Sequence, residues 1–149
     1  MSFLEYAMAL LEEARVRLES AKIFLERGKH SYVVRQSQEC VELSIKAALR
    51  VAGIEYPKRH ELSDLLLEEA GLYPSWFAAE LAEVSRISKE LMRKRAPSMY
   101  GEEALGRPPR SLFERGDAES SIEGAERVFG LVERLLNEWK GHGASKIEA

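Results

Sequence analysis

Apolar residues recur at alternating intervals of three and four residues along most of this chain. In the first 25 residues the series alternates leucine with alanine, at Leu4, Ala7, Leu11, Ala14, Leu18, Ala21 and Leu25. This spacing keeps one stripe of a helix facing a partner, and the alanines permit close approach of the two backbones. No segment alternates apolar and polar residues for long enough to predict a strand. The pattern therefore predicts an all-α fold.

Capping and turn residues divide the chain into four long predicted helices and one short one. Ser2 with Glu5 forms a capping box for the first helix, and Gly28 ends it. The other helices are expected at about 31–52, 62–70 (the short one), 74–95 and 117–140. An antiparallel up-and-down bundle is the expected arrangement. We assign residues 1–140 to a single domain and residues 141–149 to a flexible C-terminal tail.

A long loop is predicted between the last two of these helices. Residues 96–116 hold three of the five prolines and three glycines, and a residue that precedes proline disfavours helix, so the preceding helix is expected to stop by Arg95. Asp117 is then the expected N-cap of the final helix. Between Arg93 and Arg115 six basic and three acidic residues give +3, whereas the remaining 16 basic and 22 acidic residues give −6. A basic loop on an acidic body can steer an anion to one place, although an ordinary solvated loop has the same composition.

Composition narrows the class and the location of the protein. Hydrophobic residues make up 45% and charged residues 32% of the 149 residues, which is typical of a well-solvated helical domain with its own core. No apolar run approaches the ~20 residues of a membrane span. The acidic, amphipathic N-terminus is unlike a signal peptide. The single cysteine, Cys40, excludes an internal disulfide and fits a reducing compartment, so we expect a cytoplasmic protein without a membrane partner.

Charged residues on the second predicted helix form two pairs at a spacing of four. Glu42 precedes Lys46, which is the favoured order for a helix ion pair, and Arg35 precedes Glu39 in the reverse order. One interpretation is that these pairs only stabilise the exposed surface of the helix. The alternative is that Glu42 is a partly buried acid that orients a neighbouring cation.

His60 stands between a proline-containing turn and the short third helix. The structural interpretation is helix capping, and the functional one is a switchable donor near a site. The other histidines are His30 and His142, and no pair has metal-ligand spacing, so no metal is expected. No phosphate-binding glycine motif is present, so no cofactor is expected. Any phosphate would be held by arginine side chains or helix N-termini.

The segment RKRAPSMY, residues 93–100, combines cations with an aromatic residue. Arg93, Lys94 and Arg95 suit the negative end of a helix dipole. They also suit a nucleotide or RNA contact, because a guanidinium grips a phosphate bidentately and Tyr100 adds a phenol beyond the expected break at Pro97. A tyrosine packed over the end of the bundle is the competing interpretation.

Taken together, these residues resemble the HEPN family of small helical domains. QSQECVELSIKAAL, residues 36–49, contains Glu42 and Lys46 and is similar to the second helix of that family. RHELSDLL, residues 59–66, is similar to its third helix, and RGDAESSIEGAERV, residues 115–128, to the acidic start of its final helix. The order and spacing of these segments match over nearly the whole chain.

The resemblance implies an activity and partners. Many HEPN proteins are metal-independent ribonucleases with an Arg, four to six further residues and a His, followed two residues later by a Tyr in those paired with a small nucleotidyltransferase antitoxin. Arg93 and Tyr100 fit that frame, but Ser98 stands at the His position. Serine cannot move protons near pH 7 as imidazole does, so weak or absent ribonuclease activity is expected. The resemblance also implies a homodimer and modification of Tyr100 with AMP.

Three functions follow, and whether the protein is an enzyme stays open. The first is a homodimeric nucleotide- or RNA-binding module of a toxin–antitoxin-like pair with a minimal nucleotidyltransferase. Its binding residues would be Arg93, Lys94, Arg95, His60 and Lys46, supported by Glu42 and Ser98. The second is an active metal-independent endoribonuclease toxin with Arg93 and Tyr100 as catalytic residues. The third is a non-catalytic protein-interaction module.

Overall fold

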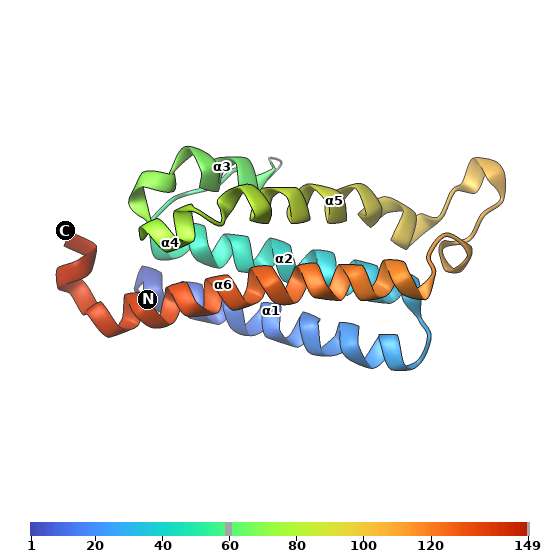
Figure 1. The fold of residues 1–149 in the computed structure, drawn as a ribbon, viewed down its shortest axis with the longest axis horizontal. Helices are drawn as coiled ribbons and strands as arrows, with labels where there is room; N and C mark the ends of the chain where they lie inside the picture. The colour runs from blue at the N-terminus through green and yellow to red at the C-terminus, as the bar shows by residue number, and fades with distance from the viewer. Residues whose placement is uncertain (59–60, 149) are drawn as a thin grey trace.

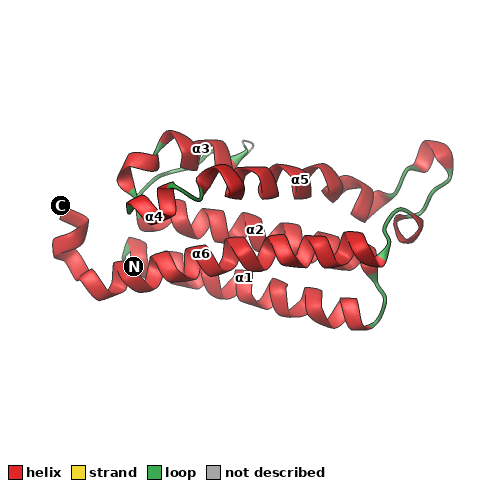
Figure 2. Ribbon diagram, in the orientation of Figure 1, coloured by secondary structure: helices red, strands yellow, loops and turns green. Residues whose placement is uncertain are grey.

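The computed structural model of the chain describes residues 1–58 and 61–148, and side chains as far as Gly141. Four long helices run alternately up and down, as the sequence predicts (Figures 1 and 2). In the described ranges the only β-type pairing is an isolated bridge between Glu102 and Arg107. The long helices are α1 (Phe3–Glu26), α2 (His30–Val51), α5 (Leu81–Tyr100) and α6 (Arg115–Glu148), and the short ones are α3 (Leu62–Glu68) and α4 (Ser75–Ala78).

The start and end of α1 confirm Ser2 as the N-cap and Gly28 as the residue that ends the helix, with Glu5 bound to the Ser2 hydroxyl. The Ser2 hydroxyl accepts a hydrogen bond from the Glu5 N–H at 3.0 Å and donates to the Glu5 carboxylate at 3.2 Å. Gly28, with φ of 69°, follows the helix. The five central members of the predicted leucine–alanine stripe are buried, at Ala7, Leu11, Ala14, Leu18 and Ala21.

α2 is the central helix and contacts α1, α3, α5 and α6. Figure 1 shows α6 running alongside α2, antiparallel to α1. The buried side of α2 contains many small residues, which lets neighbouring backbones approach closely: Ser37, Cys40, Ser44, Ala47 and Ala48. Burial raises the pKa of the Cys40 thiol to about 12, as expected for a core residue.

The predicted fourth helix divides into two. Phe77 lies on α4, and Leu81, Val84, Ile87 and Leu91 lie on α5, all buried as predicted. A 3₁₀-type hydrogen bond separates the two helices: the Glu80 N–H donates to the Phe77 carbonyl three residues back, at 2.9 Å. Upstream, α3 ends at Glu68, and Gly71 lies inside a short 3₁₀ turn at Ala70–Leu72.

The predicted end of this helix at Arg95 is wrong, because α5 continues through Pro97 to Tyr100. Pro97 has no backbone N–H to donate, and a proline at such a position normally kinks or breaks a helix. Here other contacts hold the turn in place. The Ser98 hydroxyl donates to the Arg95 carbonyl at 2.6 Å, and an Arg35 terminal nitrogen from α2 donates to the Ser98 carbonyl at 3.1 Å. Tertiary contacts therefore override a local preference, and Gly101, with φ of 67°, ends the helix.

The connection from α5 to α6 is shorter than predicted and partly ordered. It contains two 3₁₀ turns, Glu103–Leu105 and Pro109–Ser111. Asp117 is not the N-cap of α6. It is the third residue of the helix, and its carboxylate accepts the Glu114 N–H at 2.8 Å, as the acid of a capping box does.

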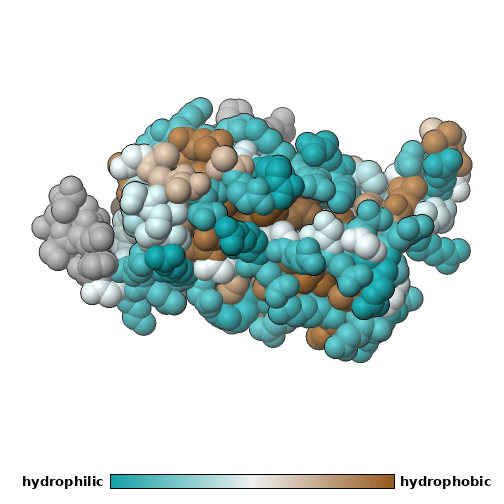
Figure 3. Space-filling model, in the orientation of Figure 1, coloured by the Kyte–Doolittle hydropathy of each residue, from teal (hydrophilic) through white to brown (hydrophobic). Residues whose placement is uncertain are grey.

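The surface in the view of Figure 3 is mostly hydrophilic, with hydrophobic side chains along the seam between α5 and α6 and at the tip of the α5–α6 connection. Leu105 in that connection is 63% exposed. Within the described residues, none of the helices combines the length and the apolar character needed to cross a membrane. The assignment of 141–149 to a flexible tail stays a prediction.

Candidate functional site

Arg93 and Tyr100 share one exposed face at the end of α5. They are seven residues apart on a continuous helix, which places them two turns apart on the same side, about 10 Å along the axis. Arg93 is exposed and pairs with no carboxylate among the described side chains. Tyr100 is 62% exposed, which does not fit a ring packed over the bundle end. The helix thus gives these two residues a fixed spacing, which a break at Pro97 would not.

A shallow depression lies beside this face. Its volume is about 260 Å³ and it is lined by Met92, Arg95, Ala96, Met99 and Tyr100. Two thioether side chains, a phenol ring and a guanidinium therefore border one open surface. Methionine is polarizable and adapts to flat ligands, and tyrosine and arginine stack on aromatic faces.

Ser98 points the other way. Its side chain is fully buried, its hydroxyl donates to the Arg95 carbonyl, and it stands seven residues after Leu91 on the core stripe of α5. The position that would carry the family's histidine is thus turned into the bundle, away from Arg93 and Tyr100. The seven-residue spacing of Val84, Leu91 and Ser98 was a signal in the sequence that could have shown this.

Arg95 and Lys94 are tied to protein acceptors. Arg95 donates to the Gln38 side chain and lies 3.7 Å from the Glu39 carboxylate, which also accepts from Arg17 at 2.9 Å. Lys94 lies 3.4 Å from Glu90. These cations contribute to helix packing as well as to the positive charge at this end of α5.

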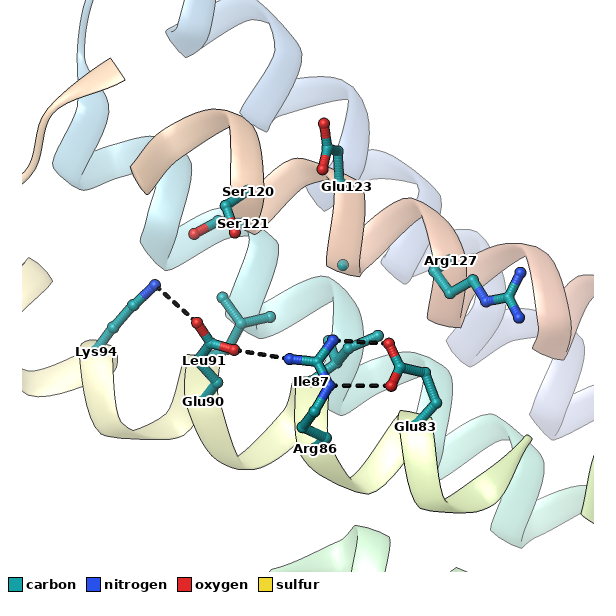
Figure 4. A pocket seen from close by; sticks show the side chains of 11 residues that line it. Glu83, Arg86, Ile87, Glu90, Leu91, Lys94, Ser120, Ser121, Glu123 and Arg127 are labelled. Atoms are coloured by element: carbon teal, nitrogen blue, oxygen red, sulfur yellow. Dashed lines mark hydrogen bonds and ion pairs between the residues drawn. The ribbon is translucent and has the colours of Figure 1, made fainter. Parts of the chain in front are cut away.

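A second hollow, of about 270 Å³, separates α5 from α6 (Figure 4). The charges along its α5 side alternate and are joined in a chain: Glu83 to Arg86 at 2.7 Å, Arg86 to Glu90 at 3.1 Å, and Glu90 to Lys94. Hydrogen bonding from Arg86 lowers the pKa of the Glu83 carboxyl. The charges compensate one another, so this groove has no excess of positive charge for a phosphate.

The polar side of α2 carries the predicted residues Glu42 and Lys46. Neither predicted pair forms: Lys46 Nζ lies 5.9 Å from the centre of the Tyr56 ring instead of on Glu42, and Arg35 contacts Ser98 and the Tyr32 ring instead of Glu39. Gln38 marks the point of α2 that contacts Arg95, near the end of α5. Lys46 lies eight residues, or about 12 Å, further along α2 from that point. The structure therefore does not bring Lys46 to Tyr100. His60 lies outside the described residues.

Sequence reasoning missed Arg50, which lies against two aromatic rings. Its guanidinium carbon is 5.1 Å from the centre of the Tyr6 ring and 5.4 Å from that of Tyr56. The three residues come from separate segments, so no motif joins them. The only signal was that Arg50 follows Lys46 at a spacing of four.

The up-and-down bundle and the basic end of α5 define a small, all-helical domain. Residues 7–135 match the model of the HEPN domain, and the chain belongs to the HEPN domain family. Two solved structures have the same fold. The crystal structure of TT1696 from Thermus thermophilus is 23% identical, with a TM-score of 0.68, and the match covers 86% of this chain and 96% of that one. ST0689, described as an archaeal HEPN homologue, is 25% identical, with a TM-score of 0.61, and the match covers 87% and 97%. No curated protein matches the chain in sequence.

Proposed function

We propose that this HEPN-domain protein is a homodimeric nucleotide- or RNA-binding module that works with a minimal nucleotidyltransferase in a toxin–antitoxin-like pair. The observation that carries the proposal is the exposed face of α5, where Arg93 and Tyr100 stand two turns apart beside the depression lined by Met92 and Met99. A phosphate on Arg93 and a base against Tyr100 would use both. A cytoplasmic location fits the lone buried Cys40.

Binding is favoured over cleavage. General acid–base catalysis needs a group that titrates near the working pH within reach of the reacting oxygen. Ser98 is buried and hydrogen-bonded to a backbone carbonyl, so neither its chemistry nor its placement provides such a group. We expect the purified protein to leave single-stranded RNA intact in the presence of EDTA. Metal-independent cleavage that is lost in Arg93→Ala would instead favour the endoribonuclease.

The binding test is fluorescence anisotropy with labelled single-stranded RNA. Arg93→Ala is expected to weaken the affinity about tenfold, which corresponds to roughly 1.4 kcal/mol, because a charge-assisted contact to phosphate is lost. Arg86→Ala is the matched control, since Arg86 lies on the same helix but is compensated by Glu83 and Glu90. Absence of binding by the wild type, or equal losses in the two variants, would contradict the proposal.

The exposed hydroxyl of Tyr100 is the proposed point of regulation. In the reaction the Tyr100 oxygen attacks the α-phosphorus of ATP, a phosphodiester to AMP forms, pyrophosphate leaves, and the phenol proton passes to the transferase or to water. The added negative charge beside Arg93 would compete with RNA phosphate. Incubation with ATP and the partner nucleotidyltransferase should add one AMP mass, and Tyr100→Phe should abolish it. A mass shift that persists in Tyr100→Phe would exclude this residue.

A homodimer would bring two copies of the Arg93–Tyr100 face into one assembly and double the local positive charge. Light scattering on the purified protein at tens of micromolar should give twice the monomer mass of 16.9 kDa. A mass that stays at the monomer value would remove the dimer from the proposal without affecting the RNA-binding test.

A further inference from the structure

Two cations and two tyrosines form a cluster at the C-terminal end of α2. Arg50 lies between Tyr6 of α1 and Tyr56 of the segment after α2, at 5.1 and 5.4 Å from the ring centres. Lys46, one turn earlier, lies 5.9 Å from the centre of the same Tyr56 ring. The cluster therefore joins two positive charges through one aromatic ring, with contributions from three segments of the chain.

The positive charge of this cluster is not compensated by an ion pair. Neither Lys46 nor Arg50 pairs with a carboxylate among the described side chains, and the buried Arg50 Nε has no hydrogen-bond partner there. Glu42 is the acid on the same side of α2, one turn before Lys46, and no ion pair joins the two. Arg50 also lies in the last turn of α2, where a cation interacts favourably with the helix dipole.

A comparable arginine elsewhere shows what a compensated cluster contains. The Arg134 guanidinium carbon lies 3.8 Å from the centre of the Trp76 ring, and its Nε lies 3.4 Å from Glu138. The same carboxylate accepts from the Trp76 indole N–H at 2.7 Å. Arg134 is thus neutralised by Glu138, whereas no carboxylate among the described side chains neutralises Arg50.

Exposed aromatic surface adjoins the two cations. Tyr6 is 44% exposed, and Phe3, one turn away on α1, is 57% exposed. The Phe3 ring lies against Gly53, where an added Cβ would come within 3.0 Å of a ring carbon. Aromatic rings beside arginine and lysine are the combination that single-stranded nucleic acid uses, because each nucleotide presents one charged phosphate and one flat base.

We propose that Tyr6, Lys46, Arg50 and Tyr56 form a second contact for single-stranded RNA, with a phosphate on the two cations and a base on the exposed rings. The inference rests on the RNA-binding function proposed above and extends it along α2. Arg35, which contacts the carbonyl of Ser98, is 15 residues from Arg50, or about 22 Å along the helix. Single-stranded sites of roughly 4–16 nucleotides cover such spans.

The experiment compares Arg50→Gln, Lys46→Gln and the control Arg134→Gln in anisotropy titrations with a labelled oligouridylate of about 12 nucleotides. Arg50→Gln and Lys46→Gln should each weaken binding roughly five- to tenfold and reduce the salt slope, d log K/d log[salt], by about 0.7, because one phosphate contact is lost. Arg134→Gln should change neither quantity. Lys46→Gln leaves the Arg50 packing in place, so it serves if Arg50→Gln proves unstable.

Failure of the second contact can be distinguished from failure of RNA binding as a whole. If the wild type binds and Arg93→Ala weakens it, while Lys46→Gln and Arg50→Gln bind as the wild type does, the second contact is excluded and the first stands. If the wild type does not bind RNA, both fall. Equal binding of an oligoglutamate peptide with the same charge would show that bases are not recognised, which would also overturn this inference.

Discussion

The two ends of the polar side of α2 use their cations differently. At the N-terminal end, Arg35 donates to the Ser98 carbonyl, and Arg95 of α5 contacts Gln38 and Glu39. At the C-terminal end, Lys46 and Arg50 contact aromatic rings and pair with no carboxylate of the described part. The first end uses positive charge to hold an unusual turn of α5. The second leaves it available for a ligand.

Exposure and charge alone therefore do not identify a binding residue. Lys94 and Arg95 belong to the most basic stretch of the chain, yet each has an acceptor within the protein. Arg50 stands in an ordinary position of the sequence, yet none of the carboxylates that the structure describes pairs with it. The informative quantity is therefore the set of acceptors within reach of each cation, which only the fold provides.

The largest expected effect on stability comes from Gly101→Ala. Gly101 ends the last turn of α5, which Arg35 holds against the N-terminal part of α2. Gly101 has φ of 67° and ψ of −155°, and an added Cβ would lie 2.2 Å from the Arg107 carbonyl oxygen. Gly101→Ala should lower the free energy of unfolding by about 3 kcal/mol, because a strained backbone and a backbone clash add. Urea titration measures this loss.

Gly106→Ala is the control for that variant. Gly106 also has a positive φ, of 66°, but nothing lies within 4 Å of an added Cβ. Its cost should be about 1 kcal/mol, from the left-handed conformation alone. Equal midpoints for the two variants would mean that the contact between Gly101 and Arg107 does not define the end of α5.

Glutamine at Arg35 and at Arg50 compares the two ends directly. Arg35→Gln should lower the free energy of unfolding by about 2 kcal/mol, because the Ser98 carbonyl loses a charged donor in a partly buried site. Arg50→Gln should cost about 1 kcal/mol from its lost cation–π contacts, and should have the larger effect on RNA affinity. If the order of the stability losses is reversed, the assignment of one end to folding and the other to binding is wrong.

Most of the fold could be predicted from periodicity and caps. The stripes of α1 and α5 and the capping box at Ser2 are local features, and local features survive in the structure. The passage of α5 through Pro97 could not be predicted, because it depends on Arg35, which is more than 60 residues away in the sequence. The start of α6 was misplaced: Glu114, three residues before the predicted N-cap Asp117, precedes the helix that Arg115 begins, and Asp117 is the third residue of the helix.

The candidate site was predictable only in part. Arg93 and Tyr100 could be named from their resemblance to the family motif, and the helix gives them a common exposed face. Lys46 was grouped with them, but the antiparallel packing of α2 on α5 carries it towards the other end. Arg50 required three segments to be placed in space, so the sequence held no pattern for it.

The smallest predicted effect is a gain in RNA affinity, whereas the preceding variants lose stability or affinity. Glu42 is the acid on the polar side of α2 next to Lys46, and it contributes to the raised pKa of Tyr56, after burial and against the opposing effect of Arg50. A phosphate on Lys46 and Arg50 would be repelled by its carboxylate. Glu42→Gln should therefore tighten RNA binding about two- to threefold at low salt, as expected for one half-buried charge near the protein surface. The gain should vanish near 0.5 M salt, roughly, because screening then acts within a few ångströms.

Glu123→Gln is the control, since Glu123 lines the groove between α5 and α6 and should change affinity only through net charge. Equal tightening in both variants would show that the body of the protein, and not the Lys46–Arg50 cluster, sets the response.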